Sequence, residues 1–159
     1  MKILKFKKRL RRLKGWEYNM SDFKAFMQQN AVETENIKFA VSARFLDDKK
    51  KPIEWEIKAV TSDEDARIRK AYTKKVTGKG GVVTQNFDAE EYLAALAARC
   101  VVYPNLNNAE LQNSYGVMSA EQLVKKMLKP GEYQTLMQKV QEVNGYDVGI
   151  NELVEEAKN

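Results

Sequence analysis

The strongest constraint in this sequence is a change of hydrophobic period along the chain. Between residues 37 and 45 apolar side chains alternate with mostly polar ones, and the alternation resumes over residues 53–59 after a polar turn at Asp47–Pro52. Two such runs are typical of half-buried strands joined in a β-hairpin. Because two strands alone are marginally stable in water, their apolar face must pack on helices, and we expect Trp55 to be buried there.

The apolar residues after position 60 have helical spacing instead. Thr61 and the acidic residues that follow it suit a helix N-terminus, and Ser119 with Gln122 forms a capping box. We expect helices over residues 21–29, 61–76, 88–104, 108–115, 119–128, 130–145 and 150–157, with residues 77–86 as a loop. Strands first and helices afterwards predict an α+β fold, in which an N-terminal β-hairpin packs on a mainly helical C-terminal part of about five to six short helices.

The basic residues are concentrated at the N-terminus. Residues 1–19 hold eight of the 27 Lys and Arg but one of the 22 acidic residues, so this segment has a net charge of +7 and the rest −2. An amphipathic helix on an anionic membrane or on phosphates, a solvated disordered tail, and a non-native extension before a start at Met20 all remain open. We favour the extension, because Ser21 begins a new helix, and divide the chain into a basic extension over 1–19 and a single domain over 20–159.

The residue types argue against an enzyme. The sequence has no histidine and one cysteine, Cys100, so neither a His-based proton relay nor a Cys–His pair is available within one chain. No apolar run reaches the roughly 20 residues that span a bilayer. We therefore predict no catalytic residue, no cofactor-binding residue and no metal ligand, and we expect a cytoplasmic binding protein.

Several short motifs after Asp88 form a recognisable pattern. They are Cys100–Asn107, Ala109–Gln112, Ser114–Met118, Met127–Leu128, Pro130–Tyr133, Gln141–Gly145 and Leu153–Asn159. With these motifs the chain resembles the XkdN-like family of phage tail assembly chaperones. The similarity extends over about residues 20–159 and is strongest from Asp88 onward.

The resemblance implies a phage or prophage protein that binds the tape measure protein in the host bacterial cytoplasm and keeps it soluble while the tail tube assembles. The tail tube protein and a frameshifted longer form of the chain are further implied partners, and a homo-oligomer is compatible with this role. Neither a membrane nor a nucleic acid is expected as a partner. The family brings no catalytic motif or cofactor, and its product need not remain in the mature virion.

Aromatic and methionine residues in the C-terminal part exceed what its short helices can easily bury. As candidate partner-binding residues we select Tyr103, Leu106, Tyr115, Met118, Tyr133 and Met137; core packing is the alternative for each. Two other functions stay open: a nucleic-acid- or membrane-associated phage protein acting through the basic segment, and a virion structural protein such as a connector.

Overall fold

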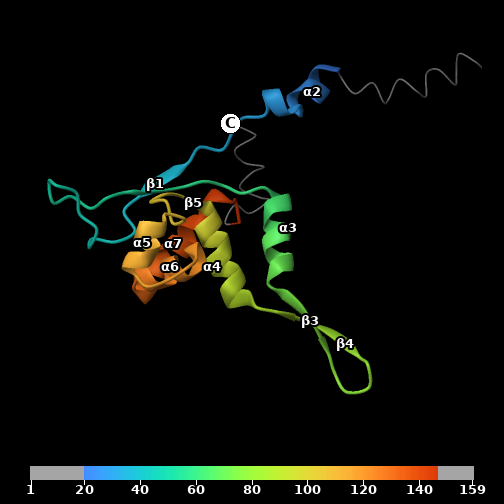
Figure 1. Ribbon diagram of the computed structural model, residues 1–159. Coiled ribbons are helices and arrows are strands. Elements are labelled where there is room, and N and C mark those ends of the chain that lie inside the picture. The colour runs from blue at the N-terminus through green and yellow to red at the C-terminus, as the bar shows by residue number, and fades with distance from the viewer. Residues whose placement is uncertain (1–19, 147–159) are drawn as a thin grey trace, which may run out of the picture. The chain divides into compact units, whose positions relative to one another are not determined.

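The structure, a computed structural model, describes residues 20–146 (Figure 1). The basic extension over 1–19 and the helix expected at 150–157 lie outside the described residues. The described part falls into two units, one up to Glu33 and one from Thr34 onward. The elements in chain order are α2 (Met20–Ala25), η2 (Gln28–Asn30), β1 (Ile37–Phe39), β2 (Trp55–Ile57), α3 (Ser62–Ala71), β3 (Thr73–Thr77), β4 (Val83–Phe87), α4 (Ala89–Cys100), β5 (Val101–Tyr103), α5 (Ala109–Ser114), α6 (Ala120–Met127) and α7 (Pro130–Val143).

The first unit holds the helix expected over residues 21–29, divided into α2 and the short 3₁₀ helix η2. Three of its apolar residues are exposed: Phe23 by 62%, Phe26 by 82% and Met27 by 37%. Over residues 23–33, where burial is described, this unit has no buried side chain.

The second unit begins with a three-stranded sheet in the order β1–β2–β5. β1 and β2 are antiparallel, with Phe39 opposite Trp55, as the alternating runs predict. Trp55 and Ile57 are 2% and 0% exposed, which confirms the inward face of this hairpin. The third strand, β5, pairs antiparallel with β2, although we expected a helix to continue toward Pro104. The β-branched pair Val101-Val102 favours an extended chain, so α4 ends at Cys100 and passes directly into the strand.

Helices α4, α6 and α7 cover the sheet and complete the core, and the α+β prediction is confirmed. Fully buried side chains come from all three helices and from the segment after β5: Cys100, Leu106, Leu123, Val124, Leu136 and Val140. Helix α3 joins through Ile68 and Tyr72, which are partly buried against the same cluster.

Local capping chemistry sets several helix ends where the sequence predicts them, although α3 and α4 end earlier than expected. The Thr61 side chain accepts from the Glu64 amide while the Glu64 carboxylate accepts from the Thr61 amide. Ser119 caps α6 by accepting from the Gln122 amide, and the Gln122 side chain in turn accepts from the Met118 amide. Gly116, with a φ of +68°, takes the left-handed conformation that ends α5.

The segment from Thr73 to Phe87 corrects our prediction. We expected a helix through Val76 followed by a loop, but β3 and β4 form an antiparallel two-stranded ribbon with Lys75 opposite Gln85. Gly80 and Gly81 have φ values of +88° and +78° in its turn. Every residue of β4 is exposed, so neither face carries the apolar alternation by which buried strands are recognised. We call residues 73–87 the ribbon, and the rest of residues 34–146 the body.

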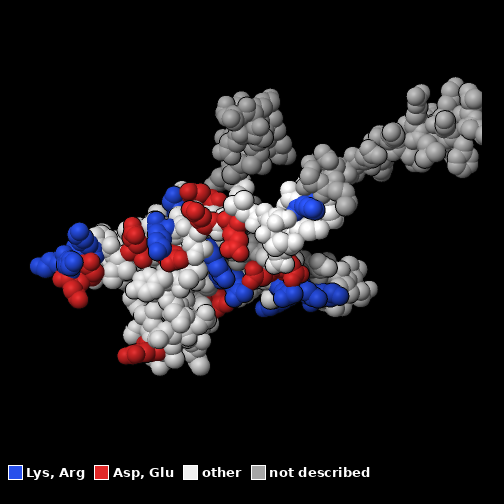
Figure 2. All heavy atoms as spheres, turned by 90° about the horizontal axis from the view of Figure 1, so that it is seen from above, with Lys and Arg blue, Asp and Glu red and all other residues white. Residues whose placement is uncertain are grey.

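Ion pairs join the elements of the body. Arg44, after β1, bonds the Glu132 carboxylate at the start of α7 with an Nη2–Oε2 distance of 2.6 Å. Lys125 of α6 pairs with Glu91 of α4, and Arg99 of α4 pairs with Glu64 of α3. Figure 2 shows acidic and basic side chains side by side over the face that it presents.

Candidate functional site

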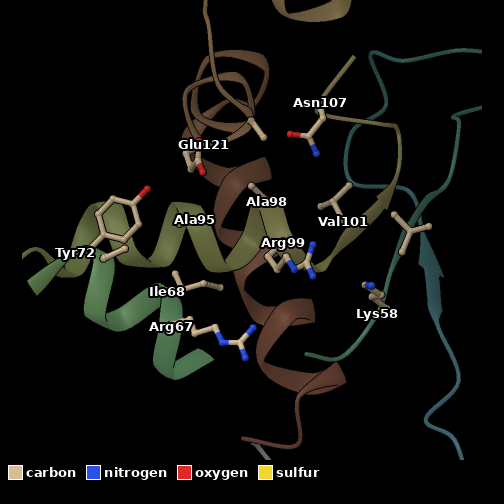
Figure 3. Close-up of a pocket in the computed structure, with 13 residues that line it drawn as sticks. Lys58, Arg67, Ile68, Tyr72, Ala95, Ala98, Arg99, Val101, Asn107 and Glu121 are labelled. Carbon is tan, nitrogen blue, oxygen red and sulfur yellow. The ribbon is translucent and has the colours of Figure 1, made fainter. Parts of the chain in front are cut away.

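The candidate site is a groove of about 570 Å³ between α3 and α4, closed at one side by β5 and the start of α6 (Figure 3). Its walls are formed by three residues of α3, the residue that follows this helix and three residues of α4: Arg67, Ile68, Ala71, Tyr72, Ala95, Ala98 and Arg99. We call this hollow the groove.

Small side chains form the floor of the groove. Ala95 and Ala98 lie one turn apart on α4, and Ala120 is the first residue of α6. They are 7%, 8% and 8% exposed, so α4 and α6 are already close to other elements there. Since alanine extends no farther than its Cβ, the hollow above these residues is open to an incoming side chain or backbone.

The rim of the groove is charged differently at its two ends. Tyr72 and Glu121 lie toward one end in Figure 3, whereas Lys58, Arg67 and Arg99 lie toward the other. Burial raises the pKa of Tyr72, and the nearby carboxylate of Glu121 raises it further. The groove therefore has an apolar floor between an anionic end and a cationic end.

The cations at the basic end have different partners. Arg67 pairs with Asp63 one turn earlier on α3, with an Nη2–Oδ2 distance of 2.6 Å, and both side chains are largely exposed. Arg99 donates to Glu64, whose pKa falls to about 2 because the Thr61 amide and then the Arg99 guanidinium hydrogen-bond its carboxylate. Within residues 23–146, no ion pair involves Lys58. Exposed pairs such as Arg67–Asp63 exchange partners at little cost, so this end can meet an acidic ligand.

A second hollow, of about 600 Å³, lies between α3 and the ribbon. It is bordered mainly by polar side chains, including Arg69, Lys70, Lys75 and Gln85. All four are exposed, so this hollow lacks the buried floor that makes the groove a better candidate.

The six candidate partner-binding residues are not in the groove, and the structure separates them into three kinds. Leu106 is 1% exposed and belongs to the core, so the expectation of a surface position is wrong for it. The chain turns inward after β5, and Leu106 is buried there in the main cluster. Tyr115, Tyr133 and Met137 are half-buried against the same cluster, Tyr133 and Met137 one turn apart on α7. Tyr103 and Met118 are 50% and 91% exposed and remain candidates for contact with a partner.

The groove residues had one available signal in the sequence, namely the surplus of alanines in α4. The segment Ala94–Ala98 holds four alanines, more than a helix needs to pack on a single neighbour. Alanine is also the best helix former, so its abundance has an explanation that requires no site.

Three features of the described residues bear on the requirements of a reactive thiol, a metal centre and a membrane span. Cys100 is fully buried, and burial raises the pKa of its thiol, which disfavours the reactive thiolate. Among residues 20–146, no three Cys, Asp or Glu side chains come together as metal ligands. No helix in this part of the chain combines the length and the hydrophobicity required to cross a membrane.

Comparison with known proteins connects this fold to phage tails. Residues 23–158 match the model of the phage XkdN-like tail assembly chaperone protein family. The phage-like element PBSX protein XkdN of Bacillus subtilis strain 168 is 31% identical over 144 residues, which cover 89% of this chain and 96% of that protein.

A second relative supplies a solved structure. The uncharacterized protein YqbN of the same Bacillus subtilis strain is 31% identical over 141 residues, or 87% of this chain and 93% of YqbN. The crystal structure of the protein YqbN superimposes with a TM-score of 0.67 at 26% identity, covering 77% of this chain and 95% of that one.

Proposed function

Because the chain belongs to the family of phage XkdN-like tail assembly chaperones, we propose that it binds the tape measure protein of its phage and keeps that protein soluble until the tail tube has formed around it. Membership of this family implies components of the phage tail as partners. The single observation that supports a helical segment of the tape measure protein as the bound client is the groove, with its alanine floor and its charged ends. The proposed work is binding alone, carried out in the host cytoplasm.

The groove has the dimensions for one row of side chains from an amphipathic helix. Its volume of about 570 Å³ is within the roughly 300–1,000 Å³ of typical ligand pockets. An amphipathic helix docks by placing apolar residues at i, i+3, i+4 and i+7 into such a groove. The small floor residues Ala95 and Ala98 let those side chains enter without displacing the chaperone's own.

A tape measure protein supplies such helices. We expect it to be long and helical with an apolar stripe, so that before assembly its stripe is exposed to water and prone to aggregate. Weak binding by many copies of a small chaperone would cover the stripe through multivalency, and each copy could leave when tube subunits compete for the same surface.

The charges at the rim suggest an orientation for the bound helix. Its acidic residues, or its negative C-terminal end, would lie by Lys58 and Arg67, and its basic residues would lie by Glu121. Complementary charge of this kind adds more to specificity and association rate than to affinity. This orientation predicts that client binding weakens as salt is raised.

The test is co-expression with the tape measure protein, scored as the fraction of tape measure protein that stays soluble. Val102 lines the groove from β5 and is 42% exposed, so Val102→Glu introduces a charge there without opening the core. Leu93, on α4 outside the groove lining, is 38% exposed, and Leu93→Glu is a matched control. Both variants should melt near the wild-type temperature, because both sites are on the surface.

We expect Val102→Glu to leave the tape measure protein insoluble and Leu93→Glu to protect it like the wild type. Protection by both variants would exclude the groove as the contact and redirect attention to Tyr103 and Met118. If wild-type protein also fails to raise the soluble fraction, the proposed function itself is wrong.

A further inference from the structure

The inference concerns the free edges of the ribbon. The Gly78 amide bonds the Val82 carbonyl, and the Asp88 amide bonds the Tyr72 carbonyl. In an antiparallel pair, hydrogen-bonded and non-hydrogen-bonded positions alternate. Even-numbered residues of the ribbon therefore bond inward, and on β4 the N–H and C=O groups of Val83, Gln85 and Phe87 point away from β3.

The two edges of the ribbon differ in charge. Between Ala66 and Phe87 the sequence has six Lys or Arg and no acidic residue. Two of these, Lys74 and Lys75, lie on β3, whereas the strand β4 has no charged residue. Lysines on an edge strand oppose the addition of another strand, so the β3 edge is protected and the β4 edge is not.

The ribbon also exposes apolar surface that a two-stranded unit cannot cover. Val82 and Val83 are 62% and 57% exposed, and Phe87 is 37% exposed. Two strands alone are marginally stable, and a third or fourth strand stabilises them. At its base Phe87 is held against Tyr92, with ring centroids 5.2 Å apart, and below the guanidinium of Arg69. This anchoring keeps the base of the β4 edge ordered before any partner arrives.

We propose that β4 is a self-association strand, which pairs antiparallel with β4 of a second copy of this chain about a two-fold axis at Gln85. In this register Val83 of each chain lies opposite Phe87 of the other, and the two Gln85 residues lie opposite each other. All three opposing pairs use the outward N–H and C=O groups. The product is a four-stranded sheet with β3 at both outer edges, where the lysines face solvent.

The side-chain pairs in this register are favourable. An aromatic residue opposite a β-branched one is a stabilising cross-strand pair, and the two-fold axis makes it occur twice. A chain-to-chain pairing through β3 would instead bring Lys74 and Lys75 of both copies together. The second copy is therefore the occupant that suits β4, because the strand is self-complementary and carries no charge to repel its symmetry mate.

The test is sedimentation velocity of the full chain over a range of concentrations, with Gln85→Lys, Gln85→Glu and their equimolar mixture. We expect the wild type to sediment as a reversible dimer. Each single variant should weaken the dimer by about tenfold or more, since like charges then lie directly opposite each other. Mixing the two variants should restore dimerisation, because a dimer of one copy of each variant places Lys opposite Glu at position 85.

Lys75→Gln is the matched control on the protected edge and should leave dimerisation unchanged. Gln85 lies opposite Lys75 within the ribbon, so circular dichroism melts at low concentration check that each variant keeps its fold. Because both residues are exposed and lie outside the core, the transition of the body should coincide in all variants. A wild-type chain that remains monomeric at every concentration overturns the proposal. Variants that dimerise like the wild type also overturn it, as does a mixture that fails to associate better than its components.

Discussion

The body and the ribbon are both built around antiparallel strands, yet their stability has different sources. In the body, β2 places Trp55 and Ile57 under helices at 2% and 0% exposure. In the ribbon, every residue of β4 is exposed, and contact with the body is concentrated at the base near Phe87. Backbone pairing is common to the two regions, so burial of apolar area is what separates them.

The comparison also applies to charge. Ion pairs of the body connect elements distant in sequence, such as Arg44 with Glu132 and Lys125 with Glu91. The ribbon carries Lys74, Lys75 and Lys79 with no acidic residue between Thr73 and Phe87. Many charges of the body are therefore paired within the chain, whereas those of the ribbon have no acidic neighbour in the ribbon. This contrast is why we place stability in the body and self-association on the ribbon.

The largest effect should come from the core of the body. Trp55→Ala should lower the free energy of unfolding by about 3–5 kcal/mol, because truncating a buried aromatic leaves a cavity. Equilibrium denaturation in urea measures the change. A loss below about 1 kcal/mol would mean that the sheet face of Trp55 is not packed as the structure has it.

A smaller effect is expected at the junction of the two regions. Asp88 follows β4 and caps α4 by accepting from the Glu91 amide at 3.2 Å. Asp88→Ala should cost about 1 kcal/mol, the typical value of an N-cap. Asp88→Asn retains the acceptor and should stay close to wild type in the same urea titration; equal losses in both variants would show that charge rather than the cap matters here.

The ion pairs of the body make its stability depend on pH in the acidic range. Hydrogen bonds from Arg44 and then Ser42 hold the pKa of Glu132 well below its ordinary value of 4.5, and the pKa of Glu64 is about 2. A depressed folded-state pKa stabilises the protein above the unfolded-state value, and the contribution is lost as pH falls toward the folded-state value. The melting temperature should therefore fall between pH 4.5 and about 2.

Glu132→Gln isolates one of these carboxylates. Its melting temperature should be below that of the wild type at neutral pH. The difference should narrow as pH falls below 4.5, because Glu132 of the unfolded wild-type chain then takes up a proton that the folded protein does not bind. If the difference in melting temperature between the two proteins stays constant over this range, the loss in Glu132→Gln comes from packing and not from the charge.

The smallest effect should come from the ribbon. Val76 lies on β3 at 47% exposure, and Val76→Thr should change the free energy of unfolding by no more than about 0.5 kcal/mol. Measured at low protein concentration beside Trp55→Ala, it gives the contrast between the two regions directly. A loss comparable to that of Trp55→Ala would mean that the ribbon and the body unfold as one unit with a shared core.

The parts of this fold that could be predicted from the sequence are those set by neighbouring residues. Thr61, Ser119 and Gly116 begin or end helices through bonds within a few residues, and each is where the pattern places it. The strand β5 could not be found in this way, because its partner β2 lies far back in the chain, with Tyr103 opposite Glu56. The β-branched residues Val101 and Val102 favour an extended chain, but only the pairing with β2 makes this segment a strand of the sheet.

The ribbon and the groove were missed for related reasons. Residues such as Thr73 and Val76 fit a strand, but with no buried face they show no apolar alternation. Ala95 and Ala98 line the groove only because α3 and β5 stand beside them. The prediction of Leu106 as a surface residue was wrong. How many apolar side chains a segment can bury depends on the elements that pack against it, and these come from distant parts of the sequence.

The direct passage of α4 into β5 connects the groove to Trp55, so a ligand in the groove can change the fluorescence of this residue. Arg99 borders the groove, Cys100 is in the core, and Val101 pairs with Ile57, two residues from Trp55. With no loop between helix and strand to absorb a displacement, tilting of α4 by a ligand would be transmitted to β2. Trp55, the only tryptophan in residues 20–146, lies beside Phe45, with ring centroids 6.4 Å apart and the rings tilted by 34°. In a Trp16→Phe variant, the fluorescence of Trp55 therefore offers a label-free signal for occupancy of a groove that Trp55 does not line.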